Sequence, residues 1–101
     1  MSDVIVTPEA AEKLVVDILQ CHNTKYENAV SVARALVAAE IDAQPGHGLS
    51  RVPFSAAQSA SGKVNGQADP LIAESKKGVF RIDAANGFAY SAFDLALSRL
   101  A

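Results

Sequence analysis

Apolar positions recur with helical spacing near the start of the chain. Residues 4–6 form a short strand-like entry, and Thr7 then provides an N-cap, with Pro8 at the first helical position. The next apolar residues have the spacing of one face of an amphipathic helix, namely Ala11, Leu14, Val15, Ile18 and Leu19. The pattern predicts a helix that begins at Pro8 and ends near His22-Asn23.

A second helix is predicted directly afterwards. Thr24 and Glu27 have the spacing of a capping box, in which each side chain bonds the backbone of the other residue. The apolar positions that follow cover more than one face of the helix: Ala29, Val30, Val32, Ala33, Leu36, Val37 and Ile41. Because its apolar surface is so broad, we expect this helix to be buried on several sides, against more protein than this chain provides.

A third, shorter helix follows a break. Pro45 and Gly46 are expected to end the second helix, because proline and glycine disfavour its continuation. Ser50 is the predicted N-cap of a helix over residues 52–61, and Gly62 is its predicted C-terminal stop.

The last third of the chain contains the strand signals. Residues 71–74 and 79–82 are predicted to pair as a β-hairpin. After Asn86-Gly87 a final helix carries the apolar residues Ala89, Ala92, Phe93, Ala96, Leu97 and Leu100. The sequence therefore predicts an α+β fold that is mainly helical, with about four helices and one β-hairpin.

Composition narrows the class of protein. A chain of 101 residues is one domain or a part of one. Half of the residues are hydrophobic and 20% are charged, as in a folded protein. The net charge of −2 argues against a nucleic-acid partner, since phosphate binding needs an excess of basic residues.

No targeting signal is expected from the sequence. No apolar run approaches the roughly 18 residues that span a bilayer, so no membrane association is expected. The first residues lack the apolar segment of a secretory signal. A single cysteine, Cys21, cannot form an internal disulfide, which suits a reducing compartment. We therefore expect a cytoplasmic protein.

One segment, AQPGHGLSRVP at residues 43–53, interrupts the helices with chemically useful residues. His47 lies between Gly46 and Gly48, and histidine is suited to proton transfer near neutral pH. Arg51 follows four residues later, and a guanidinium binds a carboxylate through two parallel hydrogen bonds. Glycines allow a substrate to approach the backbone closely, and the start of the next helix adds positive potential. The alternative is a plain helix–helix connection with an exposed histidine and a surface arginine.

Other candidates are weaker. His22 is expected at a helix C-terminus, where it has a structural role. Cys21 and His22 have no companions at metal-ligand spacing, so no metal site is expected. Glu40 and Asp42 are expected on a solvated or subunit-facing edge of the second helix. The segment around His47 also lacks the glycine pattern and the preceding strand of a phosphate-binding fingerprint.

Residues 39–53 resemble the N-terminal signature of the malate/L-lactate/sulfolactate dehydrogenase family. That signature is an acidic residue, a short spacer, Ser-His-Gly, two residues, an arginine, and an aromatic or aliphatic residue with proline. The resemblance continues through Gly62-Lys63-Val64, Asp69-Pro70, the hairpin, Ile82-Asp83 and Asn86-Gly87. The family is distinct from the Rossmann-type lactate dehydrogenases and includes ureidoglycolate dehydrogenase, diketogulonate reductase and the piperideine/pyrroline-2-carboxylate reductases.

The resemblance implies an activity and a role for each matched residue. Family members transfer hydride between NAD(P)H and a small 2-oxo acid or cyclic imino acid. His47 matches the acid that protonates the oxygen or nitrogen, and Arg51 matches the arginine near the substrate carboxylate. Gly46 and Gly48 are the expected substrate-side backbone. This chain departs from the pattern with Gly46 in place of serine, and with Asp42-Ala43 in place of a basic residue and glycine.

Family enzymes are considerably longer than this chain. The resemblance therefore implies that residues 1–101 are an N-terminal segment of a larger malate/L-lactate dehydrogenase-like fold. The NAD or NADP site would lie mainly outside the chain, and the chain alone would be inactive. Its expected partners are a small anionic substrate and the remainder of the enzyme or a second subunit, in a homodimer. The alternative function is a non-enzymatic helical module that binds another protein through its apolar faces.

Overall fold

The computed structural model describes residues 6–43, 45–76 and 79–100. Within these residues the chain forms four helices and one two-stranded sheet, namely α1 (Pro8–Gln20), α2 (Tyr26–Ile41), α3 (Val52–Ser61), β1 (Leu71–Lys76), β2 (Val79–Asp83) and α4 (Ala89–Leu100). Two single-turn 3-10 helices, η1 (Pro45–His47) and η2 (Leu49–Arg51), connect α2 to α3. The predicted mainly helical α+β arrangement is confirmed. Most of the predicted strand-like entry at residues 4–6 lies outside the described residues.

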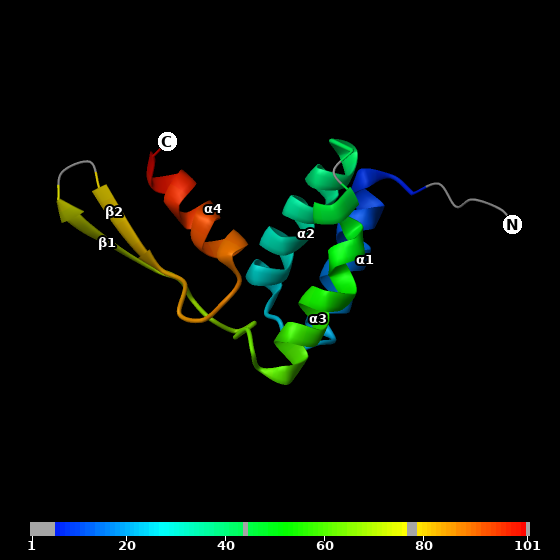
Figure 1. The fold of residues 1–101 in the computed structure, drawn as a ribbon, viewed down its shortest axis with the longest axis horizontal. Coiled ribbons are helices and arrows are strands. Elements are labelled where there is room, and N and C mark those ends of the chain that lie inside the picture. Colours follow the sequence, from blue (N-terminus) through cyan, green and yellow to red (C-terminus); the bar gives the residue numbers. More distant parts are fainter. Residues whose placement is uncertain (1–5, 44, 77–78, 101) are drawn as a thin grey trace, which may run out of the picture.

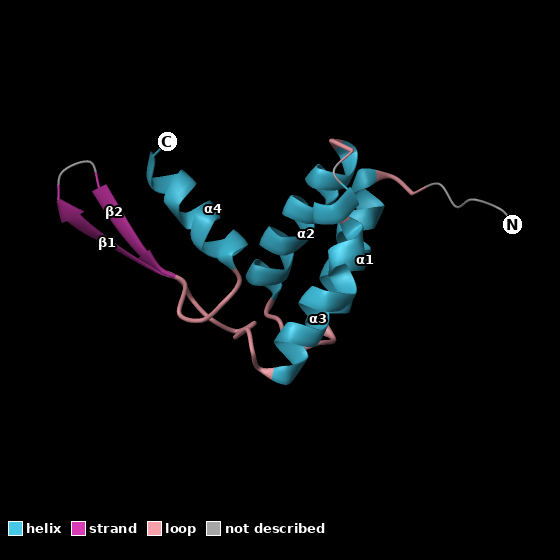
Figure 2. Cartoon of the chain, in the orientation of Figure 1, coloured by secondary structure: helices cyan, strands magenta, loops and turns pink. Residues whose placement is uncertain are grey.

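The helix α2 lies at the centre of the molecule. It packs against α1 on one side and against α4 on the other, while α3 packs on α1 (Figure 1). The hairpin β1–β2 lies beyond α4. The two loops that connect it to the helices run together (Figure 2), and the backbone N–H of Asn65 donates a 2.7 Å hydrogen bond to the backbone carbonyl of Asn86.

The start of α1 follows the local rules that predicted it. The Thr7 side chain accepts a 3.1 Å hydrogen bond from the Ala10 amide, and Pro8 is the first helical residue. The helix ends at Gln20, slightly before the predicted end. Its buried face differs from the predicted stripe, because Val16 is buried whereas Leu14 is 58% exposed. The packing of α2 and α3 against α1 selects this face.

The predicted capping box at the start of α2 is wrong. The N-cap is Lys25, which makes no side-chain cap bond and instead pairs with Asp69. Thr24 is buried, and its hydroxyl lies 2.8 Å from the hydroxyl of Ser59 on α3. The Thr24 side chain therefore makes a tertiary hydrogen bond instead of the capping bond that the local pattern predicted.

Most of the broad apolar surface of α2 is buried within this chain. The buried core of the molecule consists of small and medium aliphatic side chains with one phenylalanine: Val15, Val16, Leu19, Ala29, Val32, Ala33, Leu36, Val52, Ala56 and Phe88. Helix α2 contributes the largest share of it, and α1 and α4 cover the helix on two sides. Most of the apolar positions on which the expectation of further covering protein rested are therefore buried within this chain, whereas Ile41 is 64% exposed.

Most of the exposed apolar side chains belong to other elements. On α4, Phe93 is 68% exposed and Leu97 is 53% exposed, although both belong to its predicted apolar face. Leu14 of α1 and Phe54 of α3 are also exposed. Exposed apolar surface is thus present on α4, α1 and α3, and at the two ends of α2, where Tyr26 is 59% and Ile41 is 64% exposed.

The remaining elements match their predictions closely. Helix α3 spans the predicted residues and ends at Gly62, whose φ of 83° is in the left-handed region that favours glycine. Ser50 is not its N-cap, because this residue lies within η2 and the capping position is Arg51. The strands pair antiparallel as predicted and extend slightly further, with an irregularity between Glu74 and Lys76.

Asn28 of α2 joins the two halves of the molecule. Its buried side-chain amide donates hydrogen bonds of 2.9 Å and 2.8 Å to the carbonyls of Gly66 and Ala68, in the loop before the hairpin. Its carbonyl oxygen accepts a 2.7 Å hydrogen bond from Ser91 on α4. One side chain therefore holds both the loop and α4 on the central helix.

Candidate active site

The loop that carries His47 begins where α2 ends. Ala43 has a φ of 58°, a left-handed conformation that turns the chain away from the helix axis. The chain then forms η1, whose last residue is His47, and η2, which leads directly into α3. His47 is exposed, whereas Gly48 beside it is buried. The histidine is thus presented at the surface of a loop that packs on the protein.

Arg51 folds back over this loop. Its Nε donates a 2.7 Å hydrogen bond to the carbonyl oxygen of Gly46. The structure therefore brings together three of the predicted site residues, Gly46, His47 and Arg51. Because a guanidinium has several N–H donors, this bond uses only part of its capacity. Arg51 is exposed and can also face an anion from solvent.

Gly48 packs against the end of α2. We expected it to let a substrate approach, but its open side faces α2. A Cβ at Gly48 would lie 2.6 Å from Glu40 Oε1, 3.1 Å from the Glu40 nitrogen and 3.2 Å from the Glu40 Cα. A glycine is needed here because the loop packs so closely on the helix. At Gly46, by contrast, a Cβ would have no neighbour within 4 Å.

Glu40 is a residue of this site that sequence reasoning assigned only to the edge of α2. Its Oε1 accepts a 2.9 Å hydrogen bond from the backbone N–H of Leu49. The signal that could have indicated it is the acidic residue at the start of the family signature, which matches Glu40. Asp42, also expected at that edge, is exposed at the C-cap of α2.

A small hollow lies beside Arg51, between α3 and the start of α4. It has a volume of about 160 Å³ and is lined by Arg51, Phe54, Ser55, Gln58, Val64, Phe88 and Tyr90. Ligand pockets usually have volumes of about 300–1,000 Å³. This hollow is therefore at most a part of a binding site.

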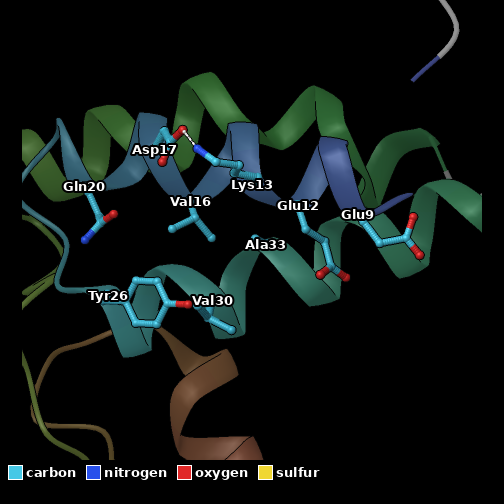
Figure 3. A pocket seen from close by; sticks show the side chains of 9 residues that line it. All are labelled: Glu9, Glu12, Lys13, Val16, Asp17, Gln20, Tyr26, Val30 and Ala33. Atoms are coloured by element: carbon cyan, nitrogen blue, oxygen red, sulfur yellow. Dashed lines mark hydrogen bonds and ion pairs between the residues drawn. The ribbon is translucent and has the colours of Figure 1, made fainter. Parts of the chain in front are cut away.

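A larger groove between α1 and α2 lies away from the His47 loop. Its volume is about 510 Å³, and Glu9, Glu12 and Asp17 line it together with Tyr26 (Figure 3). Lys13 at its edge lies 2.8 Å from Asp17, and this hydrogen bond raises the pKa of the lysine above its ordinary value. The groove is lined by three carboxylates beside apolar side chains and contains neither histidine, so we do not assign it to the reaction.

The remaining reactive side chains stay outside the site. His22 lies one residue beyond the Cys21 C-cap position of α1, and its Nδ1 donates a 2.7 Å hydrogen bond to the Ile18 carbonyl, which suits the structural role predicted for it. Cys21 is exposed. Among the described residues, no group of three or more His, Cys, Asp or Glu side chains could hold a metal ion. In the same part of the chain, no helix has the length and apolar character needed to cross a membrane.

Comparison with known proteins gives the loop a context. The family model described as malate/L-lactate dehydrogenase matches residues 6–101. The (2R)-3-sulfolactate dehydrogenase (NADP(+)) of Chromohalobacter salexigens is 38% identical over 95 residues, which cover 94% of this chain and 28% of that protein. The Δ1-pyrroline-2-carboxylate/Δ1-piperideine-2-carboxylate reductase of Pseudomonas aeruginosa is 35% identical over 95 residues, with the same two coverages. The chain thus spans less than a third of the length of these relatives.

Solved structures show the same arrangement of elements. The crystal structure of Δ1-piperideine-2-carboxylate reductase from Pseudomonas syringae pv. tomato matches with a TM-score of 0.92 and 33% identity, over 97% of this chain and 30% of that chain. Malate dehydrogenase from Entamoeba histolytica matches with a TM-score of 0.75 and 23% identity, over 89% of this chain and 25% of that chain. The second likeness concerns the fold alone.

Proposed function

This chain belongs to the malate/L-lactate dehydrogenase family, and on that premise we propose that it supplies the proton donor and the substrate-carboxylate site of an NAD(P)-dependent oxidoreductase. The substrate is a small 2-oxo acid or a cyclic imino acid. The names of the sulfolactate dehydrogenase and of the imino acid reductases support both classes. The two classes share a carboxylate next to the C=O or C=N carbon that is reduced.

In the proposed reaction His47 donates a proton to the carbonyl oxygen or the imine nitrogen. The substrate carbon takes up a hydride, so the double bond becomes a single bond with one new C–H and one new O–H or N–H. The reduced nicotinamide supplies that hydride when it is bound. The observation that carries this assignment is the exposed position of His47 at the end of η1, in a loop whose neighbouring carbonyl is held by Arg51.

Arg51 is the proposed carboxylate clamp. One of its donors holds Gly46, and the others are proposed to bind the substrate carboxylate. Gly46 lies on the open side of the loop, where the substrate would lie against its backbone. Gly48 contributes indirectly, because its packing on α2 fixes the loop.

We assign no dinucleotide site to the described residues. The hollow at Arg51 is small, and the larger groove between α1 and α2 presents carboxylates that would repel a pyrophosphate. We therefore assign NAD or NADP binding mainly to protein outside this chain. The exposed apolar side chains of α4, together with Leu14 and Phe54, support a surface that is covered by the remainder of the enzyme or by a second copy in a homodimer. The cytoplasm is the proposed compartment.

A chimeric enzyme tests the proposal. This chain replaces the matching 30% of the Pseudomonas syringae reductase, which has the same fold there. Turnover of NADPH and NADH is measured with pyruvate, oxaloacetate, sulfopyruvate and Δ1-piperideine-2-carboxylate. We expect activity with at least one of these substrates, and His47→Ala should reduce kcat by about 10²–10⁴-fold.

The second histidine provides a matched control. His22→Ala removes the same side chain from the end of α1, so it should change the melting temperature and leave kcat close to that of the parent chimera. A folded chimera without activity would support the non-enzymatic module instead. Full activity of the His47→Ala variant would reject His47 as the proton donor.

A further inference from the structure

Glu40 lies in the last turn of α2, seven residues before His47, and the reaction proposed above gives it no role. Its position is unfavourable for the helix alone, because the C-terminal end of a helix carries partial negative charge. The carboxylate instead accepts a 2.9 Å hydrogen bond from the Leu49 N–H. Hydrogen bonds to an ionised acceptor are stronger than those between neutral groups.

A second contact joins Glu40 to the same loop. Gly48 is buried against Glu40, so closely that no Cβ would fit without displacing the carboxylate or the helix backbone. The two residues that follow His47 are therefore both held on Glu40. On the other side of His47, the carbonyl of Gly46 is held by Arg51. The histidine is exposed, but the backbone on both sides of it is anchored.

We propose that Glu40 is a positioning residue for His47. Its carboxylate fixes the backbone at Leu49 and Gly48, and thereby the place from which the imidazole reaches the substrate. The proposal rests on the function proposed for His47. An error of about 1 Å in the position of a catalytic group can reduce the rate about 10²-fold, so an anchor that touches no substrate can still control turnover.

Three substitutions of Glu40 in the chimera separate positioning from charge. Glu40→Gln keeps an oxygen that can accept the Leu49 bond and loses the charge, so kcat should stay close to the parent value. Glu40→Ala has no acceptor, and Glu40→Asp keeps the charge on a side chain too short to reach. Both should reduce kcat by about 10- to 100-fold while KM for substrate and cofactor changes little. Glu27→Ala, which removes an exposed glutamate from the first turn of the same helix, is the matched control and should leave kcat unchanged.

Hydrogen exchange in the 101-residue chain provides a readout that does not depend on the enzyme. The Leu49 amide should exchange slowly in the wild-type and Glu40→Gln chains and fast in the Glu40→Ala and Glu40→Asp chains. Amides in the middle of α1 report global stability and should be unaffected. If Glu40→Asp exchanges as slowly as wild type, or if the variants without the Leu49 bond unfold more easily but keep the parent kcat, the positioning role is rejected. Failure of the function would be seen separately, as undiminished activity in His47→Ala.

Discussion

Gly48 lies directly against Glu40, whereas Gly46, two residues earlier, faces open space. A Cβ at Gly48 would come within 2.6 Å of the Glu40 carboxylate and 3.1 Å of its backbone nitrogen, but a Cβ at Gly46 would meet nothing within 4 Å. The two glycines that flank His47 look equivalent in the sequence. In the structure only Gly48 is required to be glycine by its packing.

The two glycines should therefore respond differently to alanine. Gly48→Ala forces the loop away from α2 and should reduce the free energy of unfolding by about 1–3 kcal/mol, the usual cost of overpacking. Gly46→Ala should be neutral or should stabilise the chain by about 0.4–1 kcal/mol, because it restricts the unfolded chain. Urea unfolding followed by circular dichroism measures both. Equal losses at the two positions would contradict the packing described for Gly48.

Replacement of Ala43 by glycine should increase the free energy of unfolding. Its φ of 58° lies in the left-handed region, which costs a residue with a Cβ about 1–2 kcal/mol. Ala43→Gly removes that cost but increases the entropy of the unfolded chain, so we expect a net gain of roughly 0.5–1 kcal/mol in the free energy of unfolding. The family signature also has glycine at this position.

Ala38→Gly is the matched control for this prediction. Ala38 is exposed within α2, where glycine is unfavourable by about 1 kcal/mol relative to alanine. The same change should therefore have opposite signs at positions 38 and 43 in thermal or urea unfolding. A loss of stability at both positions would show that Ala43 is not strained.

Asn28 should be among the most sensitive polar positions of the chain. Asn28→Ala leaves the Ala68 carbonyl without this donor, at about 1–3 kcal/mol if the carbonyl stays unsatisfied, whereas the Gly66 carbonyl keeps its 3.0 Å hydrogen bond from the Lys25 N–H. Ser91→Ala removes only the bond to α4 and should cost less. Amide exchange should accelerate first in α4 and the hairpin and last in α1. Uniform acceleration through all helices would mean that Asn28 supports global stability and does not join the two halves.

The isolated chain should bind the nicotinamide cofactor weakly. We propose that the dinucleotide site lies mainly outside the described residues, and one arginine cannot offset the entropy lost when a flexible ligand is fixed. We expect a Kd for NADH and NADPH of about 1 mM or weaker, which corresponds to about −4.1 kcal/mol. Isothermal titration of the purified chain measures this, and turnover by the chain alone should be undetectable. A micromolar Kd would place a cofactor site within these residues.

Short-range signals in the sequence predicted most of the elements. The Thr7 cap with Pro8, the Gly62 stop and the hairpin depend on residues within a few positions of one another, so their energetics are already present in the local chain. The placement of Arg51 near Gly46 follows in the same way, because only five positions separate them and the intervening turns are short.

Tertiary packing decided the rest. The Thr24 hydroxyl hydrogen-bonds with the Ser59 hydroxyl on α3 instead of capping α2. Val16 is buried and Leu14 is exposed, because the neighbouring helices determine which face of α1 is buried. The contacts of Glu40 with Gly48 and Leu49 cross the break between α2 and η2, so their geometry depends on how the loop packs back on the helix. The sequence by itself determined that a histidine and an arginine share one loop. Only the tertiary structure decided how that loop is anchored, because the anchoring groups become neighbours only after the helix and the loop have packed together.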